Sequence, residues 1–341
     1  MKLISFCIPS YNSQDYMRHC IDSLLIGGED VEIIIVNDGS KDDTGKIAME
    51  YQEKYPTIVK AVNKENGGHG SGVNKGMELA TGLYFKVVDS DDWADEKGYR
   101  ILLDNIRDRI KEDNLPDLYL MDFLYNRPSA HDSYRRKWDF QFKAYQVNHW
   151  DKVKKFGTGK MFLMHALFYK TDVLRKSGMK LPEHTFYVDN IFAYTPLPYV
   201  KSIYYIPEVF YIYFIGREGQ SVALPNMVKR YQQQIRVMKE MFDAHTYEDI
   251  KNMQKGLRHY MLHALNSMMV VTMMFTCGQN TPERKQDLKN FWAYCKGKDK
   301  ELYDALRHRG YSLVFNHIPF GLRGKLLLLG YKSECRRHKL G

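Results

Sequence analysis

The stretch Val87-Val88-Asp89-Ser90-Asp91-Asp92 is an apolar run that ends in three carboxylates within four residues. A buried strand that stops there places those charges at the C-terminal edge of its sheet, where ligands bind in open α/β sheets. Neighbouring carboxylates repel one another, and a divalent cation relieves the repulsion, with phosphate oxygens completing the coordination shell of the cation. The stretch therefore indicates a metal–diphosphate site. The alternative is a solvated turn in which Asp91 or Asp92 caps a helix that starts near Ala94.

The chain before this stretch alternates between strand and helix patterns. Apolar runs predict strands at 3–8, 31–36, 58–62 and 83–88, and helical spacing separates them at 16–25, 44–55 and up to residue 79. A glycine-rich loop is expected at 67–72, and further strands at 117–123 and at 199–215, the latter broken at Pro207. This βαβαβαβ order predicts a mainly parallel sheet covered by helices.

Charge is distributed unevenly along the 341 residues. Residues 1–115 carry a net charge of −7, and the remainder carries +16, which gives the total of +9. A basic second half indicates an anionic partner: phosphate, nucleic acid or an anionic lipid surface. Five scattered cysteines without a CxxC pair, and no signal-peptide pattern after Met1, favour a cytoplasmic protein. The apolar stretch 261–277 is expected to be a core helix, because polar residues interrupt it.

Three predicted strands end in polar residues that a parallel sheet would bring to one edge. They are Pro9-Ser10-Tyr11-Asn12, Asn37-Asp38-Gly39-Ser40 and the Asp89–Asp92 cluster. Asp38 can accept a hydrogen bond from a base or ribose, and Gly39 lets the backbone approach a ligand closely. Each segment alone is a weak signal, but the three in this order are far more specific.

Together these segments resemble the family 2 glycosyltransferases with the GT-A fold, closely over residues 1–125 and more loosely over 155–222. The matching strings are SFCIPSYNSQDYMRHCIDSLL, EIIIVNDGSKDDT and VVDSDDW, and the last resembles the DXD motif with Asp89 and Asp91 as its pair. The resemblance implies a Rossmann-like nucleotide-diphospho-sugar transferase fold with a helical C-terminal extension. It also implies a divalent metal, Mn²⁺ or Mg²⁺, held by Asp91 and Asp89.

The resemblance further assigns site residues. Those implied for the donor are Pro9, Tyr11, Asn12, Asp38, Gly39, Ser40, Asn66, Gly67, Asn74, Asp89, Ser90 and Arg217. The resemblance implies that Asp92 contacts the acceptor or supports the metal shell. By residue type alone, Trp93 is expected to stack on an acceptor sugar or to anchor a helix, and His165 to contact the acceptor, with a third metal ligand or a satisfied half-buried histidine as alternatives. The arginine that the family often carries in Ala-Arg-Asn is missing from Gly72-Val73-Asn74. Its substitute is expected among Lys64, Asn66, His69 and Lys75.

The segment FYVDNIF at 186–192 resembles the family's segment that carries the catalytic base, which assigns this role to Asp189. An acceptor hydroxyl is a poor nucleophile at neutral pH, and a positioned carboxylate removes its proton as attack proceeds. The alternative for Asp189 is a helix N-cap or an acid in the first turn of a helix.

We expect a catalytic domain at 1–222, with a nucleotide-sugar half at 1–125 and an acceptor half at 126–222. A helical region follows at 223–341. Its tail, 318–339, mixes leucines with Lys and Arg, which suits either the surface of an anionic membrane or an ordinary docking helix.

The expected function is inverting transfer of a sugar from a nucleotide-diphosphate donor, most simply UDP-linked, to a hydroxyl of a glycan or glycolipid. Such an enzyme would serve the synthesis of cell-surface polysaccharide, wall polymer or glycolipid at the inner face of the membrane. One rival is a metal-dependent nucleotidyltransferase, but CIPSYNSQDY lacks the Lys, Arg and Gly of a triphosphate loop. The other is a nucleic-acid-binding protein. A pI near 9.0 favours it, but no stacking or helix-turn-helix pattern does, so no nucleic-acid partner is expected.

Overall fold

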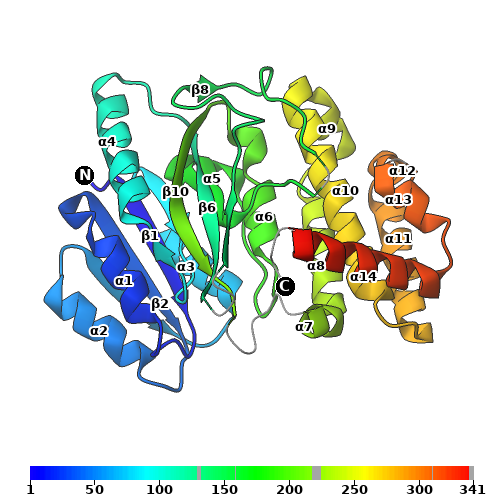
Figure 1. The fold of residues 1–341 in the computed structure, drawn as a ribbon, viewed down its shortest axis with the longest axis horizontal. Coiled ribbons are helices and arrows are strands. Elements are labelled where there is room, and N and C mark those ends of the chain that lie inside the picture. The colour runs from blue at the N-terminus through cyan, green and yellow to red at the C-terminus, as the bar shows by residue number, and fades with distance from the viewer. Residues whose placement is uncertain (129–131, 158, 217–223, 309, 338–341) are drawn as a thin grey trace. The chain divides into compact units, whose positions relative to one another are not determined.

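The computed structural model describes residues 1–128, 132–157, 159–216, 224–308 and 310–337 (Figure 1). The chain divides into two compact units. The sheet unit comprises Met1–His149, Phe162–Val188 and Tyr199–Ile215, and the helical unit comprises Trp150–Met161, Asp189–Pro198 and Gly216–Gly341. Two short segments before residue 222 therefore cluster with the C-terminal helices. The functional division at 222 stays a prediction.

The sheet unit contains one ten-stranded sheet in the order β3-β2-β1-β4-β9-β6-β10-β5, with β7 paired to β6 and β8 to β10. The strands are β1 (Ile4–Ser10), β2 (Val31–Asp38), β3 (Val59–Lys64), β4 (Tyr84–Val87), β5 (Trp93–Ala94), β6 (Leu118–Arg127), β7 (Asp132–Arg136), β8 (Val147–Asn148), β9 (Leu167–Lys170) and β10 (Ile203–Phe214). Strands β3, β2, β1 and β4 are parallel, as are β6 and β10, whereas β9 runs antiparallel to both β4 and β6. The predicted mixed α/β fold with a mainly parallel sheet is confirmed.

The central strands are mostly apolar, as expected of strands whose two faces are both covered. Every residue of β1 is buried, and in β2 only Glu32 is partly exposed. Helix α3 (His69–Leu79) packs on β1 and β2, and α1 (Met17–Leu25) packs on β2 and β5. The other helices of this unit are α2 (Thr44–Lys54), α4 (Glu96–Lys111) and α5 (Thr171–Ser177). A near-continuous apolar run is the pattern expected of a strand covered on both faces.

The glycine-rich segment differs from the prediction. Only its start is a loop, because α3 already begins at His69. Gly72 lies so close to β1 that a Cβ there would sit 2.9 Å from the Cβ of Pro9, and a Cβ at Gly76 would collide with the Cys7 side chain. These glycines allow the helix to approach the sheet. The alternative of a helix cap at Asp91 or Asp92 is contradicted: Asp95 caps α4 by accepting from Gly98 N at 3.1 Å.

Strand β10 also corrects the sequence analysis, because it continues through Pro207. Its register against β6 shifts between Ile206 and Val209 and again between Val209 and Tyr211. Such bulges leave residues unpaired, and an unpaired position tolerates the missing N–H of proline. The continuation matters for function, because it carries Tyr211 to the end of the sheet where β4 stops.

The helical unit is built around α10 (Lys255–Cys277), against which α7, α8, α9, α11, α12, α13 and α14 pack. Its helices also include α6 (Asp189–Tyr194), α7 (Leu224–Lys229), α8 (Tyr231–Asp243), α9 (Tyr247–Asn252), α11 (Pro282–Lys298), α12 (Lys300–Arg307), α13 (Gly310–Asn316) and α14 (Phe320–Arg337). Within the described ranges, α10 alone is long and apolar enough to cross a membrane, and 67% of its apolar window is buried. Such burial is what the sequence analysis expected of a core helix.

Candidate active site at the end of strand β4

Strand β4 delivers the carboxylate cluster to the end of the sheet. Val88 N still bonds to Cys7 O of β1 at 2.9 Å, and the chain then turns sharply, with Asp92 N donating to Asp89 O at 3.0 Å. Asp89 keeps a quarter of its side chain exposed, whereas Asp92 is fully buried. Asp91, between them, is half-buried. The three carboxylates of this turn therefore differ in their solvent exposure.

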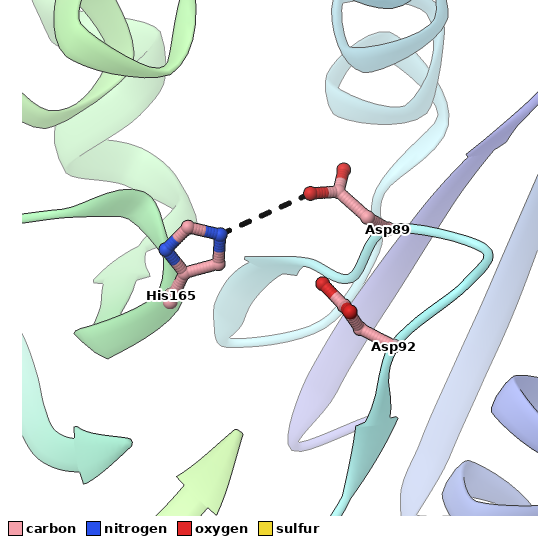
Figure 2. Close-up of side chains that lie close together, drawn as sticks. All are labelled: Asp89, Asp92 and His165. Carbon is pink, nitrogen blue, oxygen red and sulfur yellow. Dashed lines mark ion pairs between the residues drawn. The ribbon is translucent and has the colours of Figure 1, made fainter. Parts of the chain in front are cut away.

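A histidine from a distant segment completes this cluster. His165 lies on a short turn, Met164–Ala166, before β9. Its Nε2 faces Oδ2 of Asp89 at 3.9 Å, and ligand atoms of Asp89, Asp92 and His165 all lie within 4.8 Å of one another (Figure 2). Two carboxylates and an imidazole form a donor set that Mn²⁺ and related divalent ions accept. The described residues thus fit a divalent metal.

The hydroxyl of Tyr211 ties the turn together. It accepts from Asp89 N at 3.1 Å and donates to Oδ2 of Asp92 at 2.5 Å. The other oxygen of Asp92 accepts from Phe214 N at 2.8 Å. Both oxygens of Asp92 therefore have protein donors, and its carboxylate is held rigidly against β10.

The pKa shifts in the cluster follow from burial and crowding. Burial, and then the charges of Asp91 and Asp89, raise the pKa of Asp92 well above its usual value. Burial also works against ionisation of Asp89, but the hydrogen bond and charge of His69, with further contributions from His165 and Lys86, lower the pKa of Asp89 to about 2. Burial lowers the pKa of His165 to about 4. Its ring is therefore neutral near pH 7, the form that binds metals.

The end of β2 is arranged differently. The buried Asp38 accepts from Lys64 Nζ at 2.7 Å, Gly67 N at 2.9 Å and Gly68 N at 2.7 Å. Asn66 donates from its amide to Asp38 O at 2.8 Å. These bonds hold the loop that leads into α3 against the end of β2. Asp38 and the predicted donor residues Asn66 and Gly67 are thus brought together.

The loops after β1 and β2 are joined by the other predicted donor residues. Asn12, at φ 49°, donates from its backbone to Ser40 Oγ at 3.0 Å, and its side chain accepts from Lys41 N at 3.0 Å. Gly39, at φ 72°, lies so close to Asn66 that a Cβ would sit 2.8 Å from Asn66 N. Pro9 is in β1, and the exposed Tyr11 follows it. The first two strand ends therefore meet, as predicted.

The remaining predicted residues have varied surroundings. The side-chain amide of Asn74 donates to Leu181 O and accepts from Leu181 N, both at 2.9 Å, so both ends of this amide are already hydrogen-bonded. Ser90 Oγ lies 2.7 Å from Ser13 Oγ. Trp93 lies between His19 and Phe214, with ring centroids 4.7 and 6.2 Å away.

Two predicted residues lie outside this part of the sheet unit. Asp189 is the first residue of α6 in the helical unit, so the alternative of a first-turn acid describes its local structure. Arg217 lies outside the described residues.

Three residues at the site have roles that the sequence analysis missed or left open. His69 was one of four candidates to replace the missing arginine; its Nε2 lies 2.8 Å from Oδ1 of Asp89. Of the other candidates, Lys64 bonds to Asp38 and Lys75 to Glu78 at 2.8 Å. Tyr211 gave no local signal, because its partners are about 120 residues away in sequence. Lys86 did give a local signal, because it is a lysine inside an otherwise apolar strand.

Comparison with known proteins agrees with this architecture. Residues 1–349 of Staphylococcus aureus TarS, solved in complex with UDP-GlcNAc, match with a TM-score of 0.66 at 17% identity, covering 98% of this chain and 92% of that one. The mannosyltransferase PcManGT of Pyrobaculum calidifontis, solved with GDP-Man and Mn²⁺, matches with a TM-score of 0.50 at 14% identity, covering 95% and 86%. A mainly parallel sheet with carboxylates at the end of β4 is thus the GT-A glycosyltransferase fold.

Sequence comparisons identify the family. The model of glycosyl transferase family 2 matches residues 5–170. A Mycoplasma pneumoniae protein, the uncharacterized glycosyltransferase MG025 homolog, is 30% identical over 250 residues, which are 70% of this chain and 77% of that protein. The putative glycosyltransferase EpsH of Bacillus subtilis is 28% identical over 240 residues, 68% of this chain and 64% of EpsH. The chain belongs to glycosyl transferase family 2.

Proposed function

We propose that this glycosyltransferase moves a sugar from a UDP-linked donor to a hydroxyl of a glycan or glycolipid, with inversion at the anomeric carbon. The observation that carries the proposal is the cluster of Asp89, Asp92 and His165 at the C-terminal end of β4. In an α/β sheet this is where a ligand binds, and the carboxylate and imidazole ligands gathered there suit a metal that accompanies a diphosphate. The UDP-GlcNAc complex of TarS and the GDP-Man and Mn²⁺ complex of PcManGT support a nucleotide-sugar donor.

The metal would be held by Asp91 and Asp89, with His165 as a further ligand. His165 suits this role better than acceptor binding, because its neutral ring faces Asp89 and only 11% of its side chain is exposed. Asp92 suits a supporting role, since both of its oxygens already accept hydrogen bonds. When bound, the metal supplies positive charge to the departing diphosphate. His69 stands in for the missing arginine, because it is the candidate that reaches Asp89.

The nucleoside would lie against the joined loops of β1 and β2, where Pro9, Tyr11 and Asn12 adjoin Gly39 and Ser40. Asp38 would accept from the base or ribose through a lone pair left by its internal donors. These residues bind and orient the donor. Ser90, Asn74 and Arg217 remain assigned to the donor by family resemblance alone.

A panel of nucleotide sugars tests the function directly. Each is incubated with the protein and Mn²⁺ without an acceptor, and the released nucleotide is measured. We expect UDP from one UDP-sugar and far less from GDP- or CMP-sugars. Release from none of the panel would contradict the donor assignment. Pyrophosphate release from nucleoside triphosphates with a sugar phosphate would point to the rival nucleotidyltransferase.

Asp189 is proposed as the base that takes the acceptor's proton. Asp189→Asn should lower turnover by about two to four orders of magnitude, the range typical of lost general-base catalysis. Affinity for UDP, measured by calorimetry, should change little. The matched control is Asp172→Asn, because Asp172 is also an acid in the first turn of a short helix, but exposed on α5. Loss of UDP binding in Asp189→Asn would place this residue in the donor site instead.

We also propose peripheral contact of the tail with an anionic membrane. One side of α14 packs on α10, where a Cβ at Gly324 would collide with Cys277 O and where Arg323 and Leu327 are buried. The exposed side carries Leu322, Leu326 and Leu329, spaced as one helical face and 51%, 42% and 59% exposed. Lys325 and Lys332 are exposed on the same helix. Leucines that enter lipid and lysines near its surface, at about 1 kcal/mol each, suit an anionic bilayer.

Replacing the three exposed leucines by serine should release the protein from vesicles that contain acidic lipid, measured by co-sedimentation. Unlike deletion of 318–341, this variant keeps the packed side of α14. Donor hydrolysis should be unchanged. The control is Met49→Ser with Phe140→Ser, which removes exposed apolar side chains from the sheet unit. Unchanged vesicle binding in the triple variant would show that α14 serves only as a docking helix.

A further inference from the structure

Lys86 is a fully buried lysine in the strand that leads to the carboxylate cluster. It lies in β4 between Phe85 and Val87, which are also fully buried, three residues before Asp89. Placing an ammonium in a protein core is costly unless hydrogen bonds replace its water. The environment of this group should therefore explain why a cation is present there.

The side-chain nitrogen of Lys86 is hydrogen-bonded to the turn that carries His165. Its Nζ donates to Met164 O at 2.7 Å and to His165 O at 2.6 Å. Three aromatic faces surround it, with ring centroids of Tyr211 at 4.9 Å, Phe168 at 5.0 Å and Phe210 at 6.0 Å. Burial lowers the pKa of Lys86, whereas both kinds of contact favour its charged form. One side chain thus connects the strand before Asp89 to the backbone of His165.

Among the described residues, the ring of His165 is oriented by its backbone and by packing, and not by a hydrogen bond at Nδ1. A histidine that binds a metal through one ring nitrogen usually donates a hydrogen bond from the other. Within the described part of the chain, Nδ1 of His165 is buried without a hydrogen-bond partner. Its ring is held by packing on Tyr211 and Tyr213, with centroids 4.7 and 4.9 Å away. The position of its backbone therefore decides where Nε2 points.

We propose that Lys86 is a positioning residue: by holding the Met164–Ala166 turn it sets His165 Nε2 opposite Asp89 and so tunes the affinity of the site for a divalent metal. The inference rests on the metal role proposed above for Asp89 and His165. Lys86 itself contacts neither substrate nor metal. It acts through its hydrogen bonds to Met164 O and His165 O, which hold the backbone of the histidine in place.

The same strand offers a matched control. Tyr84 lies two residues before Lys86, so its side chain leaves β4 on the same face. It is also fully buried and donates from its hydroxyl to a backbone carbonyl, Pro116 O, at 2.7 Å. Tyr84→Phe therefore removes a buried side-chain-to-carbonyl bond from β4 without touching the turn of His165. A merely structural role for Lys86 would make the two variants alike.

The first test measures Mn²⁺ binding to the purified, metal-free protein by calorimetry. Lys86→Met keeps the length and bulk of the side chain and removes its donors. We expect affinity to fall about ten- to a hundredfold, the usual effect of losing a group that supports a metal ligand. Lys86→Gln, which can still donate to a carbonyl, should fall between wild type and Lys86→Met, and Tyr84→Phe should bind as wild type does. In a His165→Ala background, Lys86→Met should cause no further loss, because it acts through that ring.

The second test needs no metal. The ring resonance of His165 in the ¹³C–¹H NMR spectrum, assigned by its loss in His165→Ala, should move in Lys86→Met and stay in Tyr84→Phe. An unmoved resonance, or additive losses of affinity in the double variant, would overturn the proposal. Failure of the wild-type protein to bind Mn²⁺ would instead contradict the proposed metal site, and the resonance would still decide whether Lys86 positions the histidine. If Lys86→Met does not fold, Lys86→Gln provides the same comparisons.

Discussion

Strands β2 and β4 flank β1 on opposite sides, and each ends in a carboxylate, yet the two ends differ in how those charges are satisfied. Asp38 at the end of β2 is buried under a lysine and two backbone N–H groups. Asp89 at the end of β4 is a quarter exposed and faces two histidines. The first end is closed by the protein's own donors, whereas the second offers ligand atoms. Similar motifs therefore differ in their surroundings: Asp38 holds the loop that leads into α3, whereas Asp89 keeps part of its carboxylate accessible beside two histidines.

The largest effect on sugar transfer is expected at the β4 end, from removal of the metal or of the Asp91 carboxylate. EDTA should abolish sugar transfer, and Mn²⁺ should restore it. Asp91→Asn should lower transfer by more than about a hundredfold, since even the groups that support metal ligands contribute about ten- to a hundredfold. It should also make UDP binding independent of Mn²⁺ in calorimetry. Asp95→Asn is the control, because asparagine caps a helix as well as aspartate does. Full activity of Asp91→Asn in EDTA would remove the metal from the mechanism.

A change at the β2 end should act on stability and donor binding instead. Asp38→Asn replaces one accepting oxygen by an NH₂ group that faces donors, and a buried unsatisfied group costs about 1–3 kcal/mol. We expect the free energy of unfolding in urea to fall by this amount and the KM for the donor to rise. Mn²⁺ affinity should remain that of the wild type. A loss of Mn²⁺ affinity comparable to that of Asp91→Asn would mean that the two strand ends form one metal site.

The smallest effect is expected from Lys64→Met, which removes the cation beside Asp38 but keeps both backbone donors. About a quarter of the Lys64 side chain is exposed, so solvent screens the ion pair. Fully exposed pairs contribute about 1 kcal/mol or less, and we expect this partly exposed pair, whose carboxylate keeps two backbone donors, to lie near the upper end of that range. Unfolding in urea should show a loss within that range, and turnover should be unchanged. A loss larger than that of Asp38→Asn would mean that the lysine, rather than the backbone, closes the β2 end.

Much of the sheet was predictable because its signals are local. Strands β1, β2 and β4 are buried on both faces, so their sequences are apolar almost without interruption, and the polar residues that end them stand out. The prediction failed where a local signal had two structural meanings. Pro207 suggested a break but lies at a bulge, and Gly72 suggested a loop but allows α3 to approach β1.

The sequence by itself determined the class of fold, the family and the three strand ends, because strand burial and turn residues depend on neighbours along the chain. The tertiary structure alone decided which distant side chains meet Asp89. Tyr211 arrives on a strand that continues past a proline, His165 on a turn held by a buried lysine, and His69 on the first residue of a helix. It also decided which side of α14 is exposed, because that depends on where Gly324 lets the helix approach α10. Such meetings come from packing between segments far apart in the chain, and no local pattern encodes them.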